Sequence, residues 1–146
     1  MVLTGTYSRS LDEKRRLAVP KRLRDEFGNK DVTCLYIAPG TDRSLTLYAP
    51  DAFERLAQRL AQSSSNRADV RNYLRLFYAR AEKVDLDGQG RIRIPDRLAM
   101  LAQLGREVVL LGVHDHAEIW DRAVWELFLE KHSTDFDEMA EQAFES

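Results

Sequence analysis

The sequence predicts an α+β fold made of two similar halves, and three observations lead to this prediction. Residues 12–24 recur at residues 87–99 with an offset of 75, and Asp, Arg, Pro, Arg and Leu occupy the same five places in both stretches. In each stretch, polar and apolar residues alternate before the proline, which is typical of a half-buried strand. The proline then favours the first turn of a helix, because its missing N–H is not needed there.

The first half is predicted to contain four strands and two helices. Leu23 and Phe27 are four residues apart, on one face of a helix that Gly28 can end. The elements in chain order are a strand at 6–10, a polar turn at 12–15, a strand at 16–19, a helix after Pro20, a strand at 33–38, a turn at 39–42, a strand at 44–48 and a helix at 50–62.

The second half repeats this order after a serine-rich connection at 63–66 and a helix at 68–81. Val70, Leu74, Phe77 and Ala81 form one apolar stripe of that helix, which packs on the chain's own core or on another subunit. The later elements are a strand at 83–85, a turn at 86–90, a strand at 91–94, a short helix from Pro95 closed by Gly105, a strand at 107–113, a turn at 114–115, a strand at 117–120 and a helix at 122–132.

These elements divide the chain into four parts. We expect a first repeat at 1–62, a linker helix at 63–81, a second repeat at 82–132 and an acidic C-terminal tail at 133–146. The tail is weakly periodic and is either a loose helix or a frayed end.

Charge is unevenly distributed along the chain. The whole chain has a net charge of -2, but residues 9–24 hold seven Lys/Arg and two acids, a net charge of +5. Residues 126–146 hold seven acids and one lysine, a net charge of -6. A basic head and an acidic tail indicate a polarised partner surface, although each segment is also compatible with a solvated face.

Composition narrows the cellular context. The single cysteine, Cys34, forms no internal disulfide and suits a reducing compartment. No apolar run approaches the ~20 residues that span a bilayer, and the start of the chain does not resemble a signal peptide. We therefore expect a cytoplasmic protein that has no membrane partner.

The repeated stretch has a chemistry of its own. An aspartate at the head of a turn accepts hydrogen bonds from backbone N–H groups two residues on, and Gly90 tolerates the positive φ that such turns need. Alternation places Leu17 and Val19 in the core and Arg16 on the other face, and in the second copy it places Ile92 and Ile94 in the core. We expect Asp12 to orient Arg16 across its turn, and Asp87 to orient Arg91.

The first copy is the better candidate for binding DNA. A two-stranded ribbon fits the major groove, where Arg reads guanine and Lys or Arg contacts phosphates. A solvated basic hairpin is an equally good interpretation of the residues alone, and for the second copy the structural interpretation is favoured. The candidate DNA-binding residues are Lys14, Arg15, Arg16, Arg22 and Arg24, and the candidate turn residues are Asp12, Asp87, Gly90 and Arg91.

Catalysis is the competing class of function. His114-Asp115-His116 contains metal-ligating and general-base side chains, but three neighbours on a turn do not easily converge on one centre. The sequence holds no Gly-rich phosphate loop and no serine nucleophile motif. We therefore expect no enzyme activity, no metal site and no cofactor.

The residues quoted above closely resemble the MraZ family of bacterial transcriptional regulators. The family carries two Asp-x-x-x-Arg motifs, which Asp12 to Arg16 and Asp87 to Arg91 match, and residues 118–121 (Glu-Ile-Trp-Asp) match a late family segment. The resemblance implies a duplicated AbrB-like swapped-hairpin β-barrel with short helices and two pseudo-symmetric halves. It covers residues 5 to about 125.

The resemblance also implies a function. It is that of a nucleoid-associated transcription factor, a ring-shaped homo-oligomer (octamer or dodecamer) that binds tandem direct repeats of double-stranded promoter DNA upstream of the division and cell-wall gene cluster. Gly usually precedes the motif arginine, but Arg15 stands there in the first copy. That turn therefore has another shape or is strained. The alternative is an antitoxin-like or protein-binding module, since AbrB-like folds occur there too.

Overall fold

Six helices and eight strands make up the part of the chain that the computed structural model describes, residues 2–28, 32–63 and 66–145. The elements are β1 (Thr6–Ser10), β2 (Arg16–Ala18), α1 (Lys21–Glu26), β3 (Cys34–Pro39), β4 (Leu45–Tyr48), α2 (Pro50–Ala61), α3 (Ala68–Arg80), β5 (Glu82–Asp85), β6 (Arg91–Arg93), α4 (Asp96–Leu101), β7 (Glu107–Val113), β8 (His116–Asp121), α5 (Arg122–His132) and α6 (Phe136–Glu145). Their order confirms the predicted duplicated α+β fold. Ser64 and Ser65 of the serine-rich connection, and Met1 and Ser146, lie outside the described residues.

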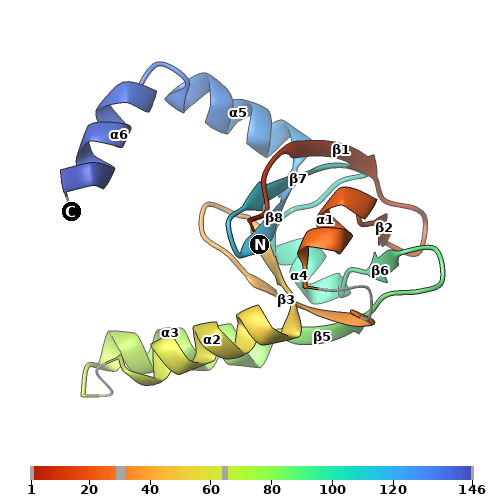
Figure 1. The fold of residues 1–146 in the computed structure, drawn as a ribbon, viewed down its shortest axis with the longest axis horizontal. Helices are drawn as coiled ribbons and strands as arrows, with labels where there is room; N and C mark the ends of the chain where they lie inside the picture. The colour runs from red at the N-terminus through yellow and green to blue at the C-terminus, as the bar shows by residue number, and fades with distance from the viewer. Residues whose placement is uncertain (1, 29–31, 64–65, 146) are drawn as a thin grey trace.

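The two halves exchange strands. Six strands form one antiparallel sheet in the order β1-β7-β8-β4-β3-β5, and β2 and β6 form a separate two-stranded ribbon (Figure 1). Each half contains one β-hairpin, β3–β4 in the first half and β7–β8 in the second. The first strand of each half pairs with the hairpin of the other half, β1 with β7 and β5 with β3. The two hairpins meet where β4 pairs with β8. Each half is therefore completed by the other.

The local strand pair expected across the Asp12 turn does not form. β1 pairs with β7, and β2 pairs with β6 with Leu17 opposite Ile92. The alternation of apolar residues specifies which face of a strand is buried, but not which strand lies beside it. The ribbon that carries the motif arginines is therefore shared between the two halves.

One core runs through both halves. Leu17, Val19, Ile92 and Ile94 are all buried, as the alternation predicted. They belong to a continuous apolar cluster that also contains residues of β3, β4, β7 and β8. Burying a side chain of this kind stabilises the fold by about 1.5–3 kcal/mol. The core therefore holds the two motif strands rigidly against the sheet.

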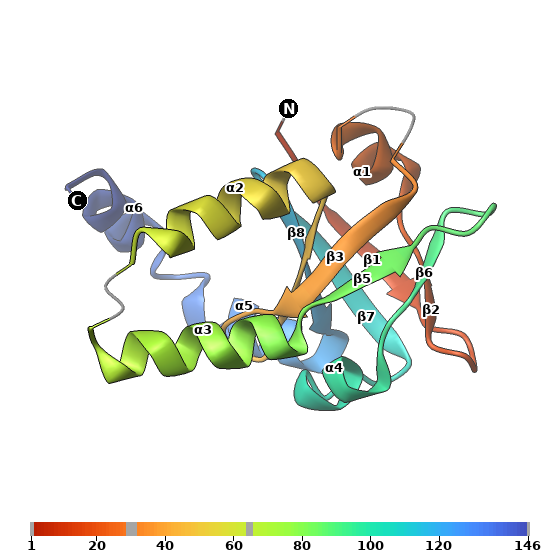
Figure 2. The same cartoon turned by 90° about the horizontal axis from the view of Figure 1, so that it is seen from below.

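The longer helices extend away from this core. The Phe53 ring of α2 is stacked on Tyr36 of β3 at 4.4 Å between centroids, and Phe77 of α3 lies 6.2 Å from Phe53. The apolar stripe of α3 thus packs on its own chain. Helix α5 packs on the sheet through an aromatic cluster of Trp120, Trp125 and Phe128. Figure 2 shows α2 and α3 side by side on one side of the sheet.

The end of the chain is helical. Residues 136–145 form α6, so the helical alternative for the acidic tail is the correct one. Among the described residues, no helix has the length and apolar character needed to cross a membrane.

Candidate nucleic-acid interface

The two Asp-x-x-x-Arg turns lie at the same end of the molecule. The loops that follow β1 and β5 project side by side, away from α2 and α3 (Figure 2). A guanidinium nitrogen of Arg91 in the second turn is 4.0 Å from the Asp12 carboxylate in the first. The fold therefore brings together two motifs that are 75 residues apart in the sequence.

Asp12 organises the first turn. Its Oδ1 accepts hydrogen bonds from the backbone N–H groups of Lys14 and Arg16, both at 2.9 Å. Its Oδ2 is 2.6 Å from Nε of Arg16. The Arg16 backbone N–H, followed by the Arg16 side chain, holds the pKa of Asp12 below its ordinary value. The carboxylate is thus a fixed anion that orients the guanidinium, as predicted.

Asp87 organises the second turn in the same way. Its Oδ1 accepts from the backbone N–H groups of Gln89 and Arg91 at 2.9 Å, and its Oδ2 is 2.8 Å from Nε of Arg91. The Arg91 backbone N–H is the main cause that lowers the pKa of Asp87. In both turns the aspartate therefore binds the backbone and side chain of the arginine four residues on, which explains why both motifs have the same spacing.

The residue before each motif arginine has a left-handed backbone. Arg15 has φ 58° and Gly90 has φ 73°. The two turns therefore have the same shape, and the non-glycine residue of the first turn carries the strain that glycine avoids in the second. The Arg15 side chain forms an ion pair with Asp96 of α4, with Nε 3.1 Å from the carboxylate.

Each turn is tied to the other half by its backbone. The N–H of Val19 donates to the carbonyl of Gly90, and the N–H of Ile94 donates to the carbonyl of Arg15, both at 3.0 Å. Arg24 fills the space beside Gly90, since a Cβ built there would be 2.6 Å from the guanidinium carbon of Arg24. The two turns are consequently one rigid unit.

The five predicted DNA-binding residues differ in what they contact. Lys14 is exposed, and no side chain in the described part of the structure pairs with it. Arg22 is exposed on α1. Arg15 and Arg16 are held by Asp96 and Asp12. The fifth, Arg24, donates from Nε to the carbonyl of Val19 at 3.0 Å, so its guanidinium also has a structural task.

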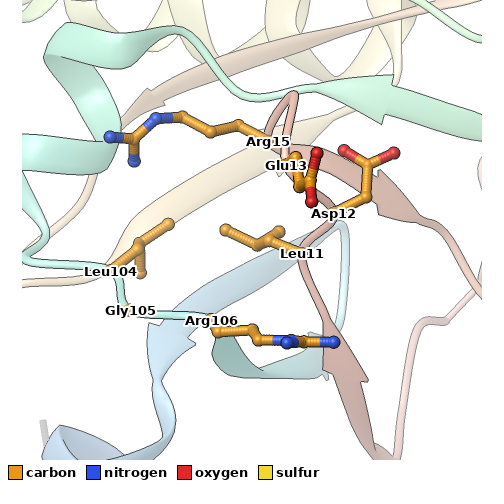
Figure 3. A pocket seen from close by; sticks show the side chains of 7 residues that line it. All are labelled: Leu11, Asp12, Glu13, Arg15, Leu104, Gly105 and Arg106. Atoms are coloured by element: carbon orange, nitrogen blue, oxygen red, sulfur yellow. The ribbon is translucent and has the colours of Figure 1, made fainter.

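Two further arginines extend the basic surface beyond the predicted set. Arg93 is exposed on β6, directly opposite Arg16 in the ribbon. The alternation of apolar residues in β6 predicts that Arg93 points outward. It does not predict that Arg93 lies opposite Arg16, because β6 pairs with a strand of the other half. Arg106 lines a cleft of about 460 Å³ beside the first turn, together with Arg15 and Glu13 (Figure 3). No sequence pattern connects Arg106 with the turn, because about 90 residues separate them.

The His114-Asp115-His116 segment is a polar cluster at the other end of the sheet. His116 Nδ1 is 2.9 Å from Asp115, and its Nε2 is 3.6 Å from Glu118, which also accepts a hydrogen bond from Trp120 Nε1. Hydrogen bonding to Glu118 is the main cause that raises the pKa of His116. These contacts join the turn residue Asp115 and the β8 side chains of His116, Glu118 and Trp120 to one another. No metal-binding group of three or more such residues occurs within the described ranges.

Comparisons with known proteins agree on one family. The family model described as "MraZ protein, putative antitoxin-like" matches twice, at residues 2–76 and 77–146. The chain is similar to the "Transcriptional regulator MraZ" of Moorella thermoacetica, with 37% identity over 138 residues covering 94% of both chains. It is also similar to the protein of the same name from Thermomicrobium roseum, with 38% identity over 121 residues, or 83% of this chain and 82% of the relative. The chain belongs to the MraZ family.

Proposed function

We propose that this protein is a sequence-specific DNA-binding transcriptional regulator whose contact surface is the pair of Asp-x-x-x-Arg turns. The observation that supports the proposal is the placement of both turns on one rigid end, with Lys14 and Arg93 exposed and without side-chain partners among the described residues. Relatives at 35–38% identity are named transcriptional regulators, which supports the regulatory part of the proposal. We propose a binding function without catalysis, exercised in the cytoplasm at the nucleoid.

Two kinds of contact follow from the geometry. Arg16 and Arg91 are held by aspartates, which fixes their direction and suits them to position the turn or read a base edge. Lys14 and Arg93 have no such restraint and suit phosphate contact, which gives affinity without sequence information. The turn thus combines oriented and free cations.

The target that fits these turns is a series of tandem repeats in a promoter, upstream of the division and cell-wall gene cluster. One chain carries a net charge of -2, and each turn offers only a few cations. A ring-shaped homo-oligomer, an octamer or a dodecamer, would set several weak turn contacts on successive repeats. Linked contacts of this kind raise affinity by factors of 10²–10⁴ without new interactions.

The first test variant removes free cations without disturbing the turn, and the second removes all three basic side chains of the first turn. Replacing Lys14 and Arg93 by Ala should weaken binding to promoter DNA and reduce the salt slope by roughly 0.9 for each phosphate that the protein no longer neutralises. The variant Lys14→Ala/Arg15→Ala/Arg16→Ala should abolish binding. The matched control Arg55→Ala/Arg67→Ala/Arg122→Ala removes three exposed cations from α2, from the residue before α3 and from α5. Unchanged gel shifts with the first two variants would refute the proposal.

An antitoxin-like role is the second candidate, and the description of the matching family model favours it. In this role the basic turns would still bind DNA, and a small toxin would bind elsewhere on the chain. Stoichiometric co-purification of a small toxin from the native host, together with rescue of growth by this protein, would support this role. The duplicated motif disfavours it, because antitoxins of this fold usually carry one copy per chain.

A further inference from the structure

Helix α6 is an acidic amphipathic helix whose apolar side chains belong to neither apolar cluster of the described residues. Phe136, Met139, Ala140 and Phe144 recur at helical spacing, and the exposed fractions of Phe136 and Phe144 are 71% and 92%. The remaining face carries the four carboxylates of the helix, which are those of Asp137, Glu138, Glu141 and Glu145. Both views show α6 standing clear of the sheet beyond the end of α5 (Figures 1 and 2).

A groove of opposite character lies between α3 and α4. It has a volume of about 440 Å³ and is lined by Arg80, Arg97, Leu98, Met100 and Leu101. The Met100 side chain is 72% exposed, which is high for a large apolar residue beside a cleft. Within the described residues, neither arginine has a carboxylate partner.

The apolar surface of the groove continues along α3. Tyr73 and Leu76 are each 52% exposed, and they share one face of α3 with Arg80 because the three residues are spaced by three and four. The groove with this face is therefore an apolar strip with two free arginines at one end. An exposed apolar strip of this kind marks an interaction site more often than a solvated surface.

We propose that α6 of one subunit binds the α3–α4 groove of a second copy of this chain. An amphipathic helix in an apolar groove is a recurrent mode of recognition, with anchors at i, i+3, i+4 and i+7 or i+8. Phe136, Met139 and Phe144 supply the anchors. Asp137 and Glu141 flank the apolar stripe, where they meet Arg80 and Arg97 of the other subunit. Opposite charges give the contact its direction and register.

The fold separates α6 from the groove of its own chain. Helix α5 is anchored on the sheet by Phe128 and its aromatic neighbours, and only residues 133–135 connect α5 with α6. Three extended residues reach about 10 Å. In both views α6 lies across the molecule from α4. The occupant of the groove is therefore the helix of another subunit.

This contact joins two different surfaces, so it is heterologous. Repetition of a heterologous contact closes a ring when the rotation between subunits allows it. The inference rests on the self-association in the proposed function and assigns the elements that produce it. It also gives the acidic C-terminal tail an assembly role that leaves the basic turns free for DNA.

Charge reversal with rescue tests the contact. The first variant, Asp137→Arg/Glu141→Arg, reverses the carboxylates that flank the stripe, and the second, Arg80→Glu/Arg97→Glu, reverses the groove. Each should raise the subunit concentration at half assembly by about tenfold or more, measured by native mass spectrometry and light scattering. The combined four-residue variant restores opposite charges and should recover assembly. The matched control Glu138→Arg/Glu145→Arg makes the same change of charge on α6 at the two carboxylates farthest from the apolar stripe and should assemble normally.

The outcomes separate this inference from the proposed function. If the wild-type protein assembles and both reversed variants assemble equally well, the inference is wrong, while wild-type gel shifts on tandem repeats still test the proposed function. A control that fails as badly as Asp137→Arg/Glu141→Arg would also overturn it, because net charge and not the contact would be responsible. Unchanged circular dichroism and melting of each dilute variant verify that the subunit is folded.

Discussion

Substituting Gly90 by Ala tests how the second turn is fitted to the first half. Gly90 has φ 73°, and a Cβ at this position would be 2.6 Å from the guanidinium carbon of Arg24. A left-handed backbone costs a non-glycine residue about 1–2 kcal/mol. The Arg24 head group must also move, which breaks its 3.0 Å hydrogen bond to the Val19 carbonyl. A half-exposed bond of this kind contributes about 1 kcal/mol.

The two contributions together predict that Gly90→Ala lowers the free energy of unfolding by about 2–3 kcal/mol. Arg24→Ala alone should cost about 1 kcal/mol, because only the hydrogen bond is removed. The double variant should cost about 2–3 kcal/mol and not the sum of the two single variants. The coupling energy of the cycle is therefore about 1 kcal/mol.

Urea denaturation at one fixed protein concentration measures all four corners of this cycle. The concentration is fixed because assembly contributes to apparent stability by mass action. A Gly90→Ala variant as stable as the wild type would show that the turn relaxes without cost. Additivity within about 0.3–0.5 kcal/mol would show that Arg24 and position 90 are independent. Either result would refute the packing argument.

Three other predictions concern the turn, the core and the polar cluster. Arg15→Gly relieves the left-handed strain but removes the Asp96 ion pair, so urea denaturation should place its stability within about 1 kcal/mol of wild type, while gel shifts weaken. Ile92→Ala removes a fully buried side chain and should cost about 2–5 kcal/mol in the same assay. Because its folded-state pKa is raised, His116 stabilises the fold fully below about pH 6.5, the unfolded value, and this contribution disappears as pH rises through the folded-state pKa. Thermal melts across that range should show the decline, and His116→Gln should remove it.

The sequence was most informative about short-range structure. The repeat predicted the order of elements, and alternation correctly placed Leu17 and Ile92 in the core. The motif spacing also predicted the pairing of Asp12 with Arg16, because a turn of this length allows few arrangements. These features depend on neighbours within about four residues, so one sequence contains the information needed to predict them.

Features that depend on residues far apart in the sequence could not be predicted in the same way. The exchange of β1 and β5 between halves leaves each strand with the same apolar pattern that a local hairpin would have. Arg93 lies opposite Arg16, and Arg106 lies beside the first turn, only because strands of the two halves pair with each other. The contact of Arg24 with Gly90 was invisible for the same reason, since about 65 residues separate them.

The difference between the two turns is best understood across the halves. Each turn lies against the short helix of the other half. Gly90 of the second turn lies beside Arg24 of the first half. Arg15 of the first turn forms an ion pair with Asp96 of α4. Position 99, the counterpart of Arg24, holds Ala. Each contact between a turn and a helix therefore contains one arginine, which the turn supplies as Arg15 in one case and the helix supplies as Arg24 in the other. A second arginine at position 90 would oppose the guanidinium of Arg24 in the same space, so the glycine of the second copy and the arginine of the first are mutually consistent parts of one interface.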